Sequence, residues 1–234
     1  MQMYHPATPQ LFHEIRMTPK EFDKAWPILR RQVRSLQLPW LDQMASQDRD
    51  PFQVLISCLL SLRTQDRVTG EASRRLFKFA RTPEAMSKLP VKKIEKTIYP
   101  VGFYRVKAQR IRDLSQKIVQ QYKGRVPNTI EELLHLKGVG RKTANLVVTL
   151  GYNQEGICVD THVHRITNRW GLVRTKTPVQ TEFALRDLLP VRYWKQLNGI
   201  LVAFGQGICK PISPLCSQCK IRLFCARVGV EQSR

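Results

Sequence analysis

The sequence lacks the long apolar segments of a membrane protein. No stretch of about eighteen apolar residues occurs among its 234 residues, so we expect no transmembrane helix. Residues 1–19 contain no apolar core of a secretory signal, so we expect an intracellular protein. The alternating pattern of surface strands is missing too, and there is no repeat of about 20–50 residues. These absences favour an all-α globular fold.

Acidic residues are scarce. The chain has 18 Asp and Glu against 39 Lys and Arg, which gives a net charge of +21 and an isoelectric point near 10.2. A nucleic acid is the simplest partner, because Lys and Arg that bind phosphates release counterions and give affinity for any sequence. A basic protein without such a partner, or one that binds membrane surfaces, is the alternative. The basic residues are spread through helical segments rather than gathered in a tail, which favours a nucleic-acid-binding surface.

Helical periodicity divides the chain into short helices. With 42% hydrophobic residues the chain can bury a core, in one large domain or in two lobes. Thr18 and Asp50 are N-cap residues, each followed by a proline at the first helical position, and a strongly apolar helix follows Asp50. We predict further helices over residues 67–80, 82–89, 91–99, 106–122, 128–135, 161–170, 178–188 and 193–207.

The stretch LKGVGRKTANLVV (residues 136–148) contains a Gly-Val-Gly corner, formed by Gly138, Val139 and Gly140, before a helix that starts at Arg141. Glycines permit a tight corner and leave N–H groups uncovered at a helix N-terminus, where an anion is favoured. Lys142 lies one residue inside that helix. A plain turn between two packed helices is the alternative. The neighbouring cations favour a phosphate cradle.

Four of the six cysteines lie close together near the C-terminus, but the chain lacks a second C-x-x-C pair there. Zinc sites are usually built from two such pairs, whereas one close pair flanked by longer loops suits a four-cysteine iron–sulfur cluster better. Both metals remain open from the spacing alone, and unligated thiols are the third alternative. The candidate ligands are Cys209, Cys216, Cys219 and Cys225.

Together these segments resemble the endonuclease III family of DNA base-excision glycosylases from about residue 50 to residue 225. LKGVGRKTAN is similar to the family's helix–hairpin–helix, VDTHVHRITNR (residues 159–169) to its aspartate segment, and the four cysteines to its 4Fe-4S iron–sulfur cluster loop. The resemblance implies a six-helix barrel lobe over residues 44–154. It also implies a cluster lobe that joins residues 1–43 to residues 155–234.

The resemblance further implies a chemistry. A base inside a duplex is unreachable, so it must be flipped into a pocket. Lys142 would then attack the sugar and form a Schiff base, and Asp160 would stabilise the positive charge that develops. A lysine does this well when nearby cations and desolvation lower its pKa, and Arg141 and Lys137 are its neighbours. Lys142 as one more phosphate contact and Asp160 as a helix N-cap are the alternatives. His162 is close to Asp160 in sequence and is expected to hold it or to pack.

Two positions depart from the family pattern. Lys137 stands where the hairpin commonly has proline, and Arg63 stands where the family often has glutamine in the gap left by the flipped base. An arginine there can hydrogen-bond a guanine opposite the lesion. Phe103 matches the family's apolar wedge, often leucine. A surface arginine and a core phenylalanine are the alternatives.

We therefore expect a monomeric glycosylase and abasic-site lyase of the cytoplasm or nucleoid that acts on oxidised pyrimidines in double-stranded DNA. A glycosylase for thymine opposite guanine is the alternative of the same fold, because Arg63 suits an opposing guanine. The adenine-specific relatives are less consistent with the chain, since residues 51–65 contain no acidic residue. A non-catalytic DNA-binding module is the alternative of another class.

Overall fold

The computed structural model describes residues 17–234, and no strand occurs among them. The fold is all-α, as predicted, and no helix in the described range is long and apolar enough to cross a membrane. The α-helices are α1 Pro19–Val33, α2 Trp40–Gln47, α3 Pro51–Ser61, α4 Asp66–Phe77, α5 Pro83–Lys88, α6 Val91–Ile98, α7 Tyr104–Tyr122, α8 Ile130–Leu134, α9 Arg141–Leu146, α10 Thr161–Arg169, α11 Pro178–Leu188 and α12 Trp194–Gly207. A π-helical turn, Val147–Gly151, continues α9, and short 3-10 turns cover Val191–Tyr193 and Arg222–Phe224.

The capping signals work as the sequence predicts. The Thr18 side chain accepts from the Glu21 N–H at 3.2 Å, and the Glu21 carboxylate accepts from the Thr18 N–H at 2.7 Å. Asp50 accepts from the N–H groups of Phe52 and Gln53. These bonds satisfy donors that the first helical turn leaves free.

Helix α2 was not predicted, because its N-terminus is capped through the tertiary fold. Pro39 precedes it and offers no side-chain acceptor. The N–H of Trp40 donates instead to the Asp66 carboxylate at the start of α4, at 2.7 Å. No local pattern reveals a cap that comes from 26 residues away.

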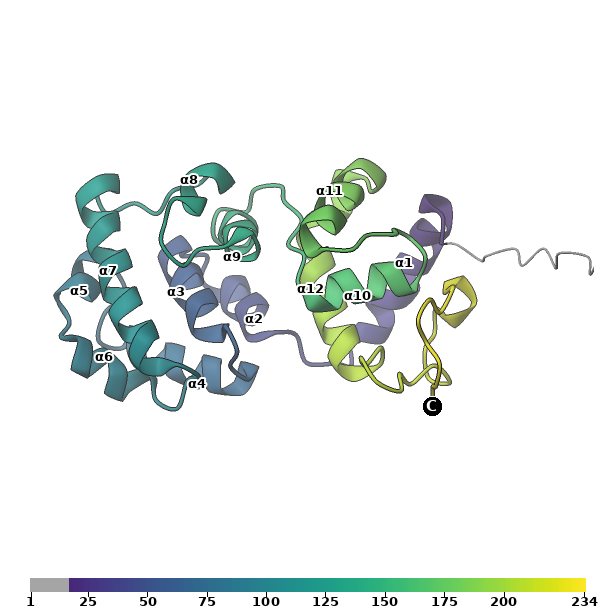
Figure 1. Ribbon diagram of the computed structural model, residues 1–234, viewed down its shortest axis with the longest axis horizontal. Helices are drawn as coiled ribbons and strands as arrows, with labels where there is room; N and C mark the ends of the chain where they lie inside the picture. Colours follow the sequence, from purple (N-terminus) through teal and green to yellow (C-terminus); the bar gives the residue numbers. More distant parts are fainter. Residues whose placement is uncertain (1–16) are drawn as a thin grey trace, which may run out of the picture.

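The buried side chains form two separate hydrophobic cores. The first core takes its residues from α2–α9 and includes Leu41, Leu55 and Ile111. The second takes its residues from α1, α10–α12 and the C-terminal loop, and includes Phe22, Trp170 and Phe204. Figure 1 shows the corresponding two groups of helices side by side, with α1 packed in the group that holds the C-terminus. We propose that each core belongs to one lobe.

The chain returns from the first core to the second along residues 153–160, which form no regular secondary structure. Ile157 and Val159 belong to the second core, whereas Cys158 between them belongs to the first. Such alternation is what an extended chain produces, because its side chains point alternately to opposite sides. This segment therefore runs between the two cores and delivers Asp160 to the place where they meet.

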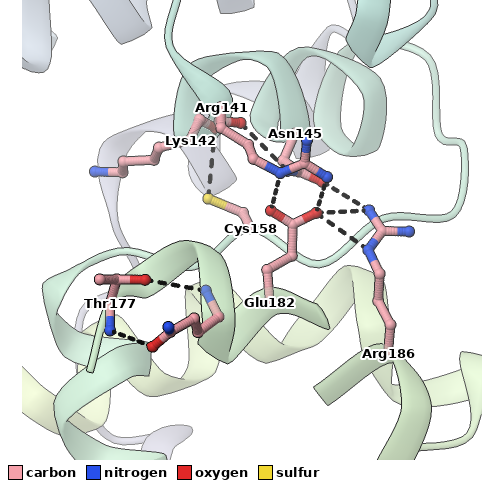
Figure 2. Close-up of polar contacts among 8 residues, drawn as sticks. Arg141, Lys142, Asn145, Cys158, Thr177, Glu182 and Arg186 are labelled. Atoms are coloured by element: carbon pink, nitrogen blue, oxygen red, sulfur yellow. Dashed lines mark hydrogen bonds and ion pairs between the residues drawn. The ribbon is translucent and has the colours of Figure 1, made fainter. Parts of the chain in front are cut away.

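A buried carboxylate joins α9 to α11 beside this segment. Glu182 of α11, whose side chain is 3% exposed, accepts from Arg141 Nε at 2.7 Å and from Arg141 Nη2 at 2.9 Å. It also contacts Arg186, whose Nη2 donates to Asn145 of α9 at 3.2 Å (Figure 2). We call Arg141, Asn145, Glu182 and Arg186 the Glu182 clamp. It fixes α9 against α11.

The clamp predicts a large effect of Glu182→Gln on stability. The substitution keeps the side-chain shape but leaves two guanidinium groups facing a neutral amide. We expect the free energy of unfolding to fall by about 3 kcal/mol, as for the loss of one partner from a buried ion pair. Urea denaturation followed by circular dichroism measures the change.

Glu71→Gln is the matched control, because Glu71 pairs with Arg67 on the exposed face of α4 at 2.8 Å. This substitution should change the free energy of unfolding by less than about 0.5 kcal/mol. If both variants unfold at the wild-type urea concentration, the clamp does not hold the lobes.

Candidate active site

The Gly-Val-Gly corner links α8 to α9, and each of its residues has a distinct role. Gly138 has a φ of +89°, a conformation that favours glycine. Val139 is 6% exposed and belongs to the first core, so it anchors the corner rather than facing solvent. Gly140 is the N-cap of α9 with an ordinary φ of −95°, and a Cβ there would meet nothing within 4 Å. The open space beside Gly140 leaves room for a ligand.

Two N–H groups of the corner are available. Those of Gly138 and Gly140 donate to no acceptor within residues 17–234, whereas the Val139 N–H donates to the Leu136 carbonyl at 3.0 Å. Lys137 is exposed at the apex of the corner. The corner thus combines free N–H donors with an exposed cation next to them in sequence, which is the chemistry that a phosphate requires.

Lys142 and Asp160 line one cavity of about 250 Å³, together with residues of α9 and α11. The Lys142 side chain is exposed, whereas Asp160 is 8% exposed. Figure 2 shows the Lys142 side chain extending away from the Glu182 clamp, with the Cys158 thiol near the Lys142 carbonyl. The structure therefore brings together the two residues that the sequence analysis selected for catalysis.

Asp160 is held by three hydrogen bonds. Its Oδ1 accepts from the N–H groups of His162 at 2.9 Å and Val163 at 3.0 Å, and its Oδ2 lies 2.8 Å from His162 Nδ1. Burial raises the pKa of Asp160, but the His162 hydrogen bond, the positive charge of Lys142 and the Val163 N–H outweigh burial, so the pKa lies below its usual value. Asp160 is thus the N-cap of α10 and a fixed carboxylate in the cavity at once.

Gly205 of α12 makes room for the His162 ring. A Cβ at this position would lie 2.7 Å from His162 Cδ2. The sequence analysis did not select Gly205, because only the packing of α10 against α12 shows the contact.

Arg141 lies beside Lys142 in sequence, but its guanidinium points into the Glu182 clamp. The hydrogen bonds that Arg141 donates to Glu182 raise the pKa of Arg141 above its usual value. The guanidinium carbon of Arg141 also lies 4.7 Å from the centroid of the Phe183 ring on α11. The structure thus assigns Arg141 a contact between lobes that the sequence analysis did not foresee.

Arg63 and Phe103 come together although they belong to different loops. The Arg63 guanidinium carbon lies 5.8 Å from the centroid of the Phe103 ring. Both residues have a positive φ, +52° and +58° respectively, which is uncommon outside glycine. Phe103 is 62% exposed, so the alternative of a core phenylalanine is wrong. We call these two residues the wedge pair.

The four C-terminal cysteines line a single cavity, next to Trp170 and Phe204 of the second core. No group of three or more His, Cys, Asp or Glu within residues 17–234 is arranged to hold a metal ion. Arg169 Nη1 donates to Cys209 Sγ at 3.3 Å, and the Arg227 N–H donates to Cys225 Sγ at 3.4 Å. Donors aimed at sulfur favour thiolates, so these two hydrogen bonds suit Cys209 and Cys225 as ligands of a cluster.

The other two cysteines are small buried residues of the first core. Cys58 is 1% exposed and Cys158 is 2% exposed. Burial raises the pKa of Cys58 to about 12, so its thiol stays protonated at neutral pH.

A model of the HhH-GPD superfamily of base excision DNA repair proteins matches residues 56–191. Endonuclease III of Thermotoga maritima is 49% identical over 178 residues, which cover 76% of this chain and 84% of that protein. The chloroplastic endonuclease III homolog 2 of Arabidopsis thaliana is 45% identical over 74% of this chain. The match spans only 47% of that longer relative.

Solved structures of endonuclease III and of a related glycosylase are also similar to this chain. A non-covalent endonuclease III–DNA complex has a TM-score of 0.78 at 31% identity and covers 89% of this chain and 95% of its own. A trapped endonuclease III–DNA covalent intermediate has a TM-score of 0.71 at 34% identity and covers 83% of this chain and 94% of its own. A thermostable thymine-DNA glycosylase has a TM-score of 0.69 at 26% identity and covers 86% of this chain and 97% of its own.

The matches cover most of this chain and include the hairpin, the Asp160 segment and the wedge pair. They favour an enzyme over the non-catalytic module. The chain therefore belongs to the endonuclease III family, within the HhH-GPD superfamily of base excision DNA repair proteins, and it is a DNA glycosylase.

Proposed function

We propose that this glycosylase releases oxidised pyrimidines of the thymine-glycol type from duplex DNA and then nicks the strand at the abasic site. The observation that carries the proposal is the cavity between the lobes, where Lys142 lies with the fixed carboxylate of Asp160. A nucleophile, a carboxylate and adjacent anion-binding N–H groups are the parts that the reaction needs. The covalent DNA intermediate of a relative supports a nucleophilic residue in this fold.

Binding begins with the DNA backbone. The free N–H groups of Gly138 and Gly140 take a phosphate, and Lys137 adds a cation at the apex of the corner. Val139 keeps the corner in place through the first core, and Arg141 keeps α9 in place through the Glu182 clamp. The wedge pair enters the space that the flipped base leaves, while the base occupies the cavity.

The chemistry then proceeds at the sugar. The neutral Lys142 amine attacks C1′, the bond from C1′ to the base breaks, and the base leaves with the electron pair and takes up a proton. The bond from C1′ to the ring oxygen then opens: the oxygen keeps the electron pair and takes up one of the protons that the amine loses, and the nitrogen lone pair forms the imine. Removal of a C2′ proton expels the 3′ phosphate, and water hydrolyses the imine. Asp160 stabilises the positive charge on the sugar and assists the proton transfers.

Asp160 suits this role because its environment keeps it ionised. Because its pKa is lowered, Asp160 carries a negative charge at neutral pH. This charge stabilises the positive charge that develops on the sugar. His162 holds Oδ2 in one orientation at 2.8 Å. A carboxylate that cannot turn away from the sugar needs little reorganisation when the charge develops.

A 4Fe-4S cluster held by Cys209, Cys216, Cys219 and Cys225 would brace the C-terminal loop against the second core. Arg169 already links this loop to α10 through the carbonyls of Lys210 and Pro211, at 2.9 and 3.1 Å. We propose that the cluster is structural and takes no part in bond cleavage.

A glycosylase for thymine opposite guanine is the second candidate. Arg63 is exposed at the tip of its loop, where its guanidinium can donate to O6 and N7 of an opposing guanine. The likeness to a thymine-DNA glycosylase agrees with this alternative.

The first test is a single-turnover assay on duplexes that contain thymine glycol, a preformed abasic site, or thymine opposite guanine, with borohydride to trap an imine. We expect release of thymine glycol and a trapped adduct with the abasic duplex. Lys142→Gln should reduce nicking by more than about a thousandfold, because the nucleophile is lost. DNA affinity should fall by less than about tenfold, because many cations share the binding.

Lys92→Gln is the control, because Lys92 is an exposed lysine that pairs with Glu95 on α6. It should nick at the wild-type rate. Equal loss of binding and nicking in Lys142→Gln would overturn the role of Lys142. Release of thymine from the guanine mismatch alone would favour the second candidate.

The proposed cluster predicts that Cys219→Ser lowers the iron and sulfide content of the purified protein. The second core should then unfold at a lower temperature, because metal binding there is coupled to folding. Elemental analysis measures the metal, and tryptophan fluorescence follows the core through Trp170, which lines the cavity. Cys158→Ala is the control, since this thiol lies in the first core, and it should keep its iron. Stoichiometric zinc in the wild-type protein would contradict the cluster.

A further inference from the structure

Lys107 of α7 is a buried lysine between the two loops that carry the wedge pair. It is 6% exposed, and its Nζ donates to the Leu60 carbonyl at 2.8 Å, to the Leu62 carbonyl at 2.5 Å and to Thr64 Oγ1 at 3.1 Å. An ammonium has three donors, so all of them are used. Burial, with the charge of Arg110, lowers the pKa of Lys107 to about 8. A buried charge is unfavourable unless such acceptors surround it.

The acceptors of Lys107 belong to the end of α3 and to the loop that follows it. The last carbonyls of a helix have no partner within the helix and favour a cation. Lys107 supplies both the hydrogen bonds and the charge. It thereby fixes residues 60–64, which include Arg63.

Thr64 connects this loop to the second one. Its Oγ1 accepts from Lys107 and also from the Gly102 N–H, at 3.1 Å in each case. Gly102 immediately precedes Phe103, and a Cβ at Gly102 would lie 2.6 Å from the Arg63 carbonyl. The two loops are therefore in backbone contact next to the wedge pair. A chain of hydrogen bonds runs from Lys107 through Thr64 to Gly102.

The backbone of the wedge pair needs such support. Arg63 and Phe103 both adopt a positive φ, which residues with side chains keep only where their surroundings determine it. Phe103 is 62% exposed, so core packing cannot hold its ring. The hydrogen bonds of Lys107 and Thr64, together with the close contact at Gly102, supply the constraint.

We infer that Lys107 is a positioning residue for base extrusion: it locks the Arg63 and Phe103 loops together, so that the wedge pair enters the base stack as one rigid body. The inference rests on the proposed function, in which the wedge pair fills the gap left by the flipped base. A preorganised pair loses little conformational freedom when it enters the DNA, whereas two independent loops would each have to be ordered. Lys107 acts through the pair and does not contact the substrate.

The test separates base extrusion from the steps at the sugar. Lys107→Met keeps the length of the side chain but removes its donors. Single-turnover release of thymine glycol from a duplex requires extrusion, whereas nicking of a preformed abasic site has no base to extrude. We expect Lys107→Met to slow base release by about tenfold or more, through misplacement of the wedge pair, and to slow abasic-site nicking by less than about threefold.

A double-mutant cycle ties this effect to the wedge pair. In a background of Arg63→Ala with Phe103→Ala, Lys107→Met should slow base release by less than about threefold further, because residues that act together are not additive. Thr64→Val removes the hydroxyl that links the two loops, and with it one of the three acceptors of Lys107, and it should slow base release selectively as well. It keeps the test decisive if Lys107→Met does not fold.

The control is Lys92→Met, because Lys92 is an exposed lysine of α6 that pairs with Glu95 on the same helix. It should leave both rates unchanged. Equal slowing of base release and abasic-site nicking by Lys107→Met would overturn the inference, as would its full effect in the background without the wedge pair. If the wild-type protein neither releases thymine glycol nor forms an imine, the proposed function itself fails, whatever Lys107 does.

Discussion

One buried carboxylate connects the two lobes beside the cavity, and the geometry of the site depends on it. Glu182 of α11 binds both Arg141 and Arg186, and Arg186 in turn binds Asn145 of α9. Helix α9 carries Lys142 and packs in the first core, whereas Asp160 begins α10 in the second. The Glu182 clamp therefore sets how Lys142, the proposed nucleophile, faces Asp160. In a chain with 39 cations and 18 acids, this one buried acid pairs with two of the guanidinium groups at the interface.

Each part of the site is held by contacts that leave its functional group free. Val139 anchors the corner in the first core while the N–H groups of Gly138 and Gly140 stay available. The backbone donors of α10 and the His162 ring fix Asp160 at the cavity. Lys107 donates hydrogen bonds to residues 60–64, the loop that carries Arg63, while the Phe103 ring remains exposed. A reaction on an extruded base requires functional groups that are held in place by such contacts and remain free to meet the DNA.

Features encoded by neighbouring residues could be predicted from the sequence. The caps at Thr18 and Asp50, the start of α9 at Arg141 and the all-α fold depend on residues a few positions apart. Lys142 and Asp160 were selected through their motifs and the family resemblance. The Glu182 clamp and the contacts of Lys107 could not be predicted, because their partners lie about 40 residues away in the chain. Helix α2 was missed for the same reason, since Asp66 of α4 caps it.

The central claim is that Lys142, and no other of the chain's lysines, forms the covalent bond to DNA. The most direct measurement is borohydride trapping of the protein on abasic duplex DNA, followed by proteolysis and mass spectrometry of the peptide that carries the sugar remnant. The account predicts one modified peptide, which contains Lys142 within GRKTAN (residues 140–145). Modification of another lysine or of the N-terminal amine, with Lys142 unmodified, would contradict it.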